Sequence, residues 1–461
     1  MGLIRSKWLN VLPVVIAVSC RGPSFAGEDA KGKVRLLPSE ANSTRVSCTL
    51  EVGGDLVSEG AKDTTRHKLS VVAELEYEEL RLAGSREENG IVRAVRSYKT
   101  AKSTVKIGDG GTNTELRPGR RLIGVELDGT RTTVFSPAGT MTRGELDLID
   151  NVANSLGVEG LLPAEAVGEG DTWSLSKEFA AGFLSLDAVS ECAVECAVTE
   201  VTPEVVRFQF TGDVEGAKHG VVTRLGVKGK ARFDRRLNAV DWVGLLIKEV
   251  RPMGHVTHGL DVVVRVQSRM VPVEKSTALN EETLAEPVPA PTPELTALFF
   301  EPVHEEWTLE HDRGWHANLN HHDLAVFRLL DHGKFIAQCN VSPLPKVEPG
   351  KQATLEDFQR EIESLLDETS RGFADAGQWS SDKEYRILRT TVLGEVEGQP
   401  ITWRYYLVSD RHGRRATFAF SVATDLVERL ADMDRRLVES LTFAAPKVAA
   451  VENKGKREER K

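Results

Sequence analysis

Apolar and polar residues alternate along much of the chain up to about residue 273, and this period of two predicts β-strands. Between Leu69 and Leu82, for example, Val71, Ala73 and Leu75 alternate with glutamates. Glycine-rich turns separate the segments, so the pattern predicts an antiparallel sheet with one solvated face. The other expected strands are Ile91–Ile107, Arg121–Leu127, Thr132–Phe135, Asp171–Leu175, Ala193–Val201, Val205–Val214, Val221–Phe233, Asn238–Val250 and Leu260–Val273.

One helix is expected among these strands. Thr142 and Glu145 have the spacing of a capping box, and Gly157 is placed to end the helix. The intervening apolar residues recur at helical spacing and form a stripe that must be buried. They are Leu146, Ile149, Val152, Ala153 and Leu156. The segment Val240–Ile247 is apolar on both sides, so it fits the sheet surface beneath this helix.

A proline-rich linker, residues 276–297, divides the chain into domains at residues 27–275 and 298–445. Pro287, Pro289, Pro291 and Pro293 occupy every second position, which predicts an extended, semi-rigid spacer. In the second domain the pattern predicts a hairpin, a helix from the Thr354 cap, a three-strand meander and a closing helix from Thr424. The strands of the hairpin and meander are Leu324–Leu330, Lys334–Val341, Tyr385–Glu395, Ile401–Ser409 and Arg415–Val422. Residues 446–461 are charged, which predicts a disordered tail.

The expected fold class is therefore α+β. A curved antiparallel β half-barrel with a covering helix precedes a second α/β sandwich domain with an antiparallel sheet.

Residues 1–26 have the pattern of a secretory signal peptide. Arg5 and Lys7 precede an apolar run from Trp8 to Val18, and Ser24 and Ala26 suit a cleavage site. A second interpretation is a bacterial lipoprotein signal, in which Cys20 is lipidated and anchors the protein. Both interpretations predict export, to the periplasm or beyond the cell.

The composition narrows the possible partners. The formal net charge of the 461 residues is −10, which disfavours nucleic-acid binding because phosphate contacts need a basic surface. After Val18, no apolar run approaches the roughly 20 residues of a membrane-spanning helix. The sequence therefore predicts a water-soluble chain after the leader.

Three cysteines lie on expected strands of the first domain. Cys48, Cys192 and Cys196 each share a face with apolar residues, which favours buried, unpaired cysteines. The alternative is a disulfide from Cys48 to Cys192 or Cys196 across neighbouring strands, which an oxidising compartment permits.

Catalytic, cofactor and metal sites are not predicted by any complete motif. The glycine pairs lack the residues that hold a phosphate, and neither a nucleophile elbow nor a catalytic cysteine signature occurs. Six of the eleven histidines cluster between residues 304 and 332, which leaves a metal site as an alternative. They are His304, His311, His316, His321, His322 and His332.

Two groups of strand residues predict either a filled core or an apolar, ligand-binding pocket. One group is Val206, Phe208 and Phe210, and the other is Val262, Val264 and Val266. Because inward apolar side chains are the rule in any sheet, the pattern favours a filled core.

The first domain resembles the lipoprotein-carrier (LolA/LolB-like) superfamily. The resemblance rests on the strand–helix–strand order, on Leu161-Leu162-Pro163 leading to Gly170-Asp171-Thr172-Trp173, and on the hairpins from Gly212 to Asp261. It implies an apolar concave surface that holds acyl chains or a partner, without catalytic residues.

The second domain is similar to the fold of the photosystem II extrinsic protein PsbP and a nuclear import factor. The shared features are Asp312-Arg313-Gly314-Trp315, the meander, and the closing segment Glu439–Phe443. This resemblance implies a fold and says little about activity. The whole chain also resembles large secreted proteins of environmental bacteria.

These patterns together predict an exported, non-enzymatic envelope protein that binds a lipid-like ligand or another protein. The alternative function is metal binding or metal-dependent catalysis by the histidine-rich segment 304–332. A third hypothesis, a structural spacer with two inert domains, is also compatible with the sequence.

Overall fold

The structure is a computed structural model. It describes residues 33–59, 63–82, 90–129, 131–302, 307–321, 323–365 and 370–444. The expected leader with Cys20, the tail 446–461, His304 and His322 lie outside the described residues.

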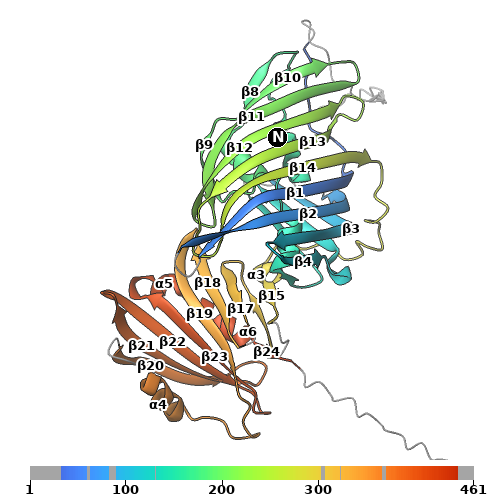
Figure 1. Cartoon of the computed structure of the whole chain (residues 1–461). Coiled ribbons are helices and arrows are strands. Elements are labelled where there is room, and N and C mark those ends of the chain that lie inside the picture. The colour runs from blue at the N-terminus through green and yellow to red at the C-terminus, as the bar shows by residue number, and fades with distance from the viewer. Residues whose placement is uncertain are drawn as a thin grey trace, which may run out of the picture.

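The chain has an α+β fold of two domains, and a large antiparallel sheet forms most of the first (Figure 1). Its strands are β1 (Ser43–Glu59), β2 (Thr64–Arg81), β3 (Ile91–Ile107), β4 (Gly110–Glu115), β5 (Leu122–Asp128), β6 (Arg131–Phe135), β8 (Thr172–Ser174), β9 (Ala188–Cys192), β10 (Glu195–Val201), β11 (Val205–Lys218), β12 (Val221–Asp234), β13 (Ala239–Arg251) and β14 (Gly259–Val273). The order is β6-β5-β3-β2-β1-β14-β13-β12-β11-β10-β8, with β4 on β3 and β9 on β11. The sheet is open, with β6 and β8 at its ends.

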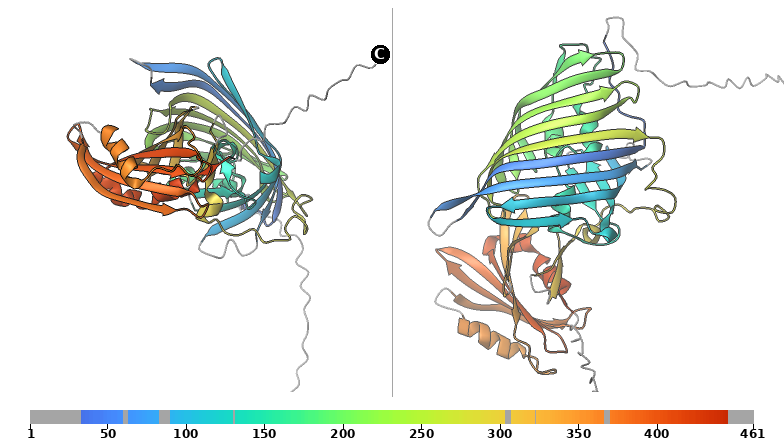
Figure 2. Two further views of the ribbon diagram at one scale, coloured as in Figure 1. Left: turned by 90° about the horizontal axis from the view of Figure 1, so that it is seen from below. Right: turned by 45° about the vertical axis from the view of Figure 1, so that its right-hand side comes forward.

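Short helices cover one face of this curved sheet, as the right-hand view of Figure 2 shows. They are α1 (Arg143–Ile149), the 3-10 helix η2 (Ser155–Leu161) and α2 (Lys177–Phe183); a further 3-10 turn, η1 (Pro118–Arg120), precedes β5. The alternate strand residues that face the helices form one continuous apolar core. Period-two alternation thus places one side of each long strand against the helices and leaves the other side to solvent.

The helix expected from Thr142 to Gly157 begins where it was predicted, but the observed helix is shorter than expected. The Thr142 side chain accepts from the Glu145 backbone and Glu145 reciprocates, which completes the capping box. The helix ends at Ile149, and Ala153 adopts a positive φ of 60° before η2 begins. The chain turns there because Asn154 caps η2 and also accepts a hydrogen bond from Arg96 on the sheet.

A buried polar network joins η2 to the sheet. Arg96 Nε donates to Glu79 Oε2 at 2.8 Å, and both side chains are 3% exposed. Ser155 of η2 donates to the same carboxylate at 2.8 Å and lies 3.0 Å from the Tyr77 hydroxyl. The Arg96 guanidinium also lies over the Tyr77 ring. The network supplies each buried charge with partners, which a low-dielectric interior requires.

A seven-stranded antiparallel sheet forms the centre of the second domain. Its strands are β17 (Trp315–Asn320), β18 (Ala325–Asp331), β19 (Lys334–Leu344), β20 (Ser370–Ser380), β21 (Arg386–Val396), β22 (Gln399–Ser409) and β23 (Arg415–Ala423), in the order β17-β18-β19-β23-β22-β21-β20. One face packs on α4 (Leu355–Leu365) through Phe358 and Ile362. The opposite face packs on α5 (Val427–Leu430) and α6 (Met433–Ser440). The predicted hairpin and meander are confirmed.

The closing helix expected from Thr424 is divided into three pieces. The 3-10 helix η3 (Thr424–Leu426) leads into α5, and Ala431 takes a positive φ of 48° before α6. Asp434 of α6 is 1% exposed and accepts hydrogen bonds from Arg404 at 2.8 Å and from the Tyr406 hydroxyl at 2.5 Å. The helical period is interrupted so that this carboxylate can reach its partners on β22.

The two domains share a small sheet. Its strands, in order, are β24 (Thr442–Phe443), β16 (Trp307–His311), β15 (Leu298–Phe300) and β7 (Met141–Thr142). The β7 strand belongs to the first domain and pairs in parallel with β15, which follows α3 (Pro293–Thr296) at the end of the linker. Arginines cross the junction in both directions: Arg143 donates to the Arg313 carbonyl, and Arg313 donates to the Val134 carbonyl.

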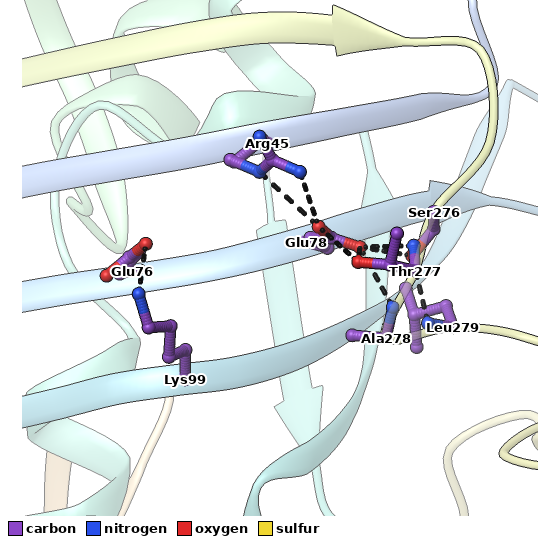
Figure 3. Close-up of polar contacts among 8 residues, drawn as sticks. All are labelled: Arg45, Glu76, Glu78, Lys99, Ser276, Thr277, Ala278 and Leu279. Atoms are coloured by element: carbon purple, nitrogen blue, oxygen red, sulfur yellow. Dashed lines mark hydrogen bonds and ion pairs between the residues drawn. The ribbon is translucent and has the colours of Figure 1, made fainter.

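The segment after β14 is fastened to the sheet by Glu78 of β2. Figure 3 shows the Glu78 carboxylate between Arg45 and the turn that begins at Ser276. It accepts from Arg45 at 3.0 Å, from the Ser276 hydroxyl at 2.6 Å and from the backbone N–H groups of Thr277 and Ala278 at 2.8 and 3.0 Å. Burial would raise the pKa of Glu78, but these hydrogen bonds lower it to about 2. The start of the linker is therefore held by a charged anchor.

The variant Glu78→Gln is expected to be less stable than the wild type by about 3 kcal/mol at pH 7, which corresponds to the lowered pKa. Because the carboxylate binds protons less readily in the folded state, its stabilisation is complete above pH 4.5 and disappears as the pH falls towards 2. Urea unfolding at pH 7, 4 and 3 measures the difference.

Glu76→Gln is the matched control, since Glu76 lies two residues away and pairs with Lys99 in an exposed ion pair of 3.0 Å (Figure 3). Its loss should lower the stability by less than about 1 kcal/mol. Equal losses for both variants, or a Glu78 effect that persists at pH 2, would contradict the anchor.

Candidate functional site

The face of the large sheet beneath the helices is filled by side chains. Val206, Phe208 and Phe210 are at most 1% exposed, and Val262, Val264 and Val266 are at most 9% exposed. The cavities found beside η2 measure about 10 and 30 Å³, less than the space of an acyl chain. The interpretation of these six residues as core is confirmed. The other face of the sheet is not covered by helices and is accessible to a ligand.

The uncovered face carries a shallow groove on β11 to β14. Trp242 of β13 is the centre of the groove, and its ring lies over Gly244, where a Cβ atom would be 2.5 Å from Cη2 of the indole. Two depressions flank the ring, of about 580 and 490 Å³, and share Gln209, Lys230 and Trp242 as lining residues. We call this feature the Trp242 groove. Glycine at position 244 is required because it lets the indole lie flat against the strand.

Basic residues from three strands, β11, β12 and β14, surround Trp242. The strand register places Arg207 opposite Arg232, Arg232 opposite Trp242, and Trp242 opposite Arg269. Two rows further along the same face, Lys228 lies opposite Leu246, which is opposite Arg265. Because paired residues of an antiparallel sheet share a face, these side chains all project to the same side.

Half of these cations have carboxylate partners and half do not. Arg207 pairs with Glu200, Arg232 with Asp241, and Arg265 with Glu51 at 3.2 Å. The hydrogen bond and charge of Asp241, partly opposed by desolvation, raise the pKa of Arg232.

Within the described ranges, Lys228, Lys230 and Arg269 form no ion pair, and all three are exposed. A chain with a net charge of −10 thus keeps three uncompensated positive charges together beside an indole ring.

This arrangement suits a ligand that has both an anionic and an apolar part. Lysine and arginine donate charge-assisted hydrogen bonds to phosphate or carboxylate oxygens. Trp242 and Leu246, the latter 38% exposed, offer apolar surface between the cations. The strand that carries Trp242 and Leu246 was expected to lie beneath a helix, and the cations of the groove were not predicted from the sequence. The signal for them is the basic residues at every second position in Lys228-Gly229-Lys230-Ala231-Arg232.

The cysteines of the described residues are all free, and three of them are buried. The alternative of a bridge from Cys48 to Cys192 or Cys196 is wrong. Four strands separate β1 from β9 and β10 in the sheet, which at ~4.8 Å per strand is far beyond the ~7 Å that a disulfide spans.

The histidines of the segment 304–332 are dispersed. His311 is buried and bonds the Asp312 carbonyl, His321 contacts Asp323, and His332 contacts Asp331. His316 instead lies against His219 of the first domain. In the part of the chain that the structure describes, no three histidine, cysteine or carboxylate side chains gather as ligands for a metal ion.

Within the described ranges, no helix combines the length and the apolarity that crossing a bilayer requires. No family model matches the chain. No curated protein matches it either.

Solved structures share only distant similarity with this chain. A crystal structure from Bacteroides thetaiotaomicron is 12% identical over 32% of this chain, with a TM-score of 0.24, and the chain spans about half, 48%, of its length. Cyanobacterial PsbP from Synechocystis is 15% identical and is covered over 99% of its length by 35% of this chain, with a TM-score of 0.24. A Pseudomonas aeruginosa protein of unknown function is 12% identical, covers 32% of this chain over 98% of its own length, and has a TM-score of 0.22.

The PsbP match agrees in part with the resemblance stated for the second domain, and the lipoprotein-carrier resemblance of the first domain stays a prediction. At these TM-scores, the similarity assigns no function to this chain.

Proposed function

We propose that this chain is an exported, non-enzymatic binding protein that holds an acidic lipid in the Trp242 groove. The anionic headgroup lies against Lys228, Lys230 and Arg269, and the apolar part lies on Trp242 and Leu246. The observation that carries the proposal is the cluster of three exposed cations without ion-pair partners, in the described ranges, around a half-buried indole.

The apolar surface favours a lipid over a simple anion. A phosphate ion would use only the cations, whereas the register places Leu246 and Trp242 between them. Indole rings suit such a boundary because one part of the ring is apolar and the N–H is polar. Each ion pair at an exposed site contributes at most about 1 kcal/mol, so binding depends on several contacts and weakens with salt.

The ligand class is the one expected from the sequence, but the proposed site lies on the other face of the sheet. The lipoprotein-carrier resemblance implies a ligand on the helix-covered face, which apolar side chains fill. Export, expected from residues 1–26, would bring the groove into contact with envelope lipids. Export and ligand binding in the Trp242 groove are independent proposals, since binding can be tested with purified protein.

Vesicle co-sedimentation tests the proposal directly. The full mature chain is expected to bind vesicles containing phosphatidylglycerol and to bind pure phosphatidylcholine vesicles at least ten-fold more weakly. The variant Lys228→Glu/Lys230→Glu/Arg269→Glu should lose at least ten-fold in affinity for the acidic vesicles, because attraction becomes repulsion.

The matched control is Lys106→Glu/Lys275→Glu/Lys346→Glu, which changes the net charge equally at exposed lysines outside the groove. It should bind within about two-fold of the wild type. Trp242→Ala tests the apolar part and should weaken vesicle binding while leaving binding of soluble polyphosphate unchanged. Equal losses for both triple variants, or binding of polyphosphate without vesicle binding, would exclude the lipid proposal.

A further inference from the structure

Hairpin tips of the two domains meet end to end at the domain junction. The turn between β11 and β12 approaches the turn between β18 and β19 so closely that a Cβ atom on Gly220 would lie 1.9 Å from the Gly333 carbonyl oxygen. Beside this contact, the His219 ring meets the His316 ring edge-to-face, with centroids 5.1 Å apart. Nearby, His255 stacks on Phe335 at 4.9 Å, and its carbonyl accepts hydrogen bonds from Asn318 and Arg328. The two domains are thus closely packed at this junction, and the imidazoles of His219 and His316 lie in the contact.

The charged groups around the two imidazoles are mostly cations. Arg143 of α1 faces both rings, and Lys218 and Arg251 face His219. His311 of β16 adds a third imidazole beside His316. The carboxylate that faces His316 is Asp187, whose side chain also accepts from the His219 backbone N–H. Asp147 of α1 and Asp150, which directly follows α1, both face Lys218 and Arg143.

We infer that the junction around His219 and His316 is an acid-sensitive latch, which holds the domains together while both imidazoles are neutral and loosens when they are protonated. Protonation of either ring places a positive charge next to the Arg143 cation and next to the second ring. The edge-to-face contact of the two rings then becomes repulsive. This inference does not depend on the groove or its ligand.

The direction of the pH effect follows from linkage. Burial, reinforced by the neighbouring cations, lowers the pKa of His219 and of His316 to about 3, and burial lowers that of His311 to about 4. Separation of the domains exposes the rings of His219 and His316, which lie at the junction, and returns the pKa of each to about 6.5. The separated state therefore binds more protons, and docking weakens progressively as the pH falls below 6.5. Each imidazole can change the docking equilibrium constant by at most about ten-fold per pH unit. The partial exposure of the rings makes the change smaller than this maximum.

Two carboxylic acids, Asp147 and Asp150, act in the opposite sense. Burial raises the pKa of both, so the docked state takes up a proton there more readily than the separated state. This proton uptake favours the docked state and opposes the histidine effect as the pH falls. The net opening on acidification is therefore smaller than the two imidazoles alone would give.

Small-angle X-ray scattering of the full mature chain, coupled to size exclusion, tests the latch. The radius of gyration is expected to increase between pH 7.5 and pH 5, with the circular dichroism spectrum unchanged. Hydrogen exchange at the β7–β15 amides, corrected for the intrinsic pH dependence, should accelerate at least ten-fold over the same range. An unchanged radius and unchanged corrected exchange at pH 5 would exclude the latch.

The variant His219→Gln/His316→Gln removes the titration and keeps polar side chains of similar size. It should retain the compact radius and slow exchange at pH 5, whereas the control His67→Gln/His412→Gln, at positions outside the junction, should open like the wild type. If the His219→Gln/His316→Gln variant opens at pH 5, groups other than these two imidazoles cause the pH effect, and the inference is overturned. If this variant is already open at pH 7.5, the single variant His316→Gln decides, with an expected weaker pH dependence.

Discussion

Replacing Arg96 by alanine is expected to lower the free energy of unfolding by about 3–5 kcal/mol, because it leaves the Glu79 carboxylate buried without its cation. Both side chains are 3% exposed, and their 2.8 Å contact joins β2 to β3 beneath η2. The loss also removes hydrogen bonds from Arg96 to Asn154 and Ser155, which position η2. Urea unfolding followed by circular dichroism measures the difference.

A second arginine of β3, Arg93, supplies the control. Arg93 contacts Glu126 at 2.7 Å but is 38% exposed, so Arg93→Ala should cost less than about 1 kcal/mol. The double variant Arg96→Met/Glu79→Leu should recover most of the stability lost in Arg96→Ala, because it removes both buried charges. If Arg96→Ala lowered the free energy of unfolding no more than Arg93→Ala does, the buried network would not contribute to stability.

Phe210→Ala is expected to lower the free energy of unfolding by about 3–5 kcal/mol, as truncation of buried phenylalanines does. Phe210 is 1% exposed, meets Phe183 of α2 edge-on, and lies over Gly229, where a Cβ atom would be 2.0 Å from its Cζ. Truncation would leave a cavity between the sheet and α2, which close-packed neighbours fill only in part. Thermal and urea unfolding at pH 7 provide the measurement.

The same variant separates the two faces of the sheet. Phe210 borders the Trp242 groove, but strand alternation places its side chain on the face opposite to Gln209 and Thr211. Vesicle binding at a temperature well below the unfolding midpoint should therefore stay within about two-fold of the wild type. Phe373→Ala is the control, since Phe373 is 40% exposed, and its effect on stability should be below about 1 kcal/mol. A loss of vesicle binding in Phe210→Ala with an intact fold would mean that the ligand occupies the helix-covered face.

Local patterns determined most of the secondary structure. The alternation in Ile91–Ile107 is found unchanged as β3, and the capping box at Thr142 begins α1 as expected. Periodicity predicts such elements because burial of one face dominates in a long regular strand or at a capped helix start. It also determined which residues of Val205–Val214 enter the core, since the inward face is the apolar one.

Helix ends were decided by tertiary contacts. The apolar stripe continues past Ile149 in sequence, yet the chain turns there because Asn154 and Ser155 have partners on Arg96 and Glu79. The residue Ala431 interrupts the last helix in the same way, next to the buried contacts of Asp434. Such contacts join residues far apart in the chain, so no local pattern contains them.

The candidate sites were also decided by the tertiary structure. The sequence determined that basic residues recur at every second position near Lys230, but strand order alone brings Arg269 to the same face. Likewise, the histidine-rich segment suggested a metal site, whereas domain docking places His316 beside His219. The physical reason is that local periodicity specifies which face a residue takes. Which distant residues share that face depends on strand register and domain packing.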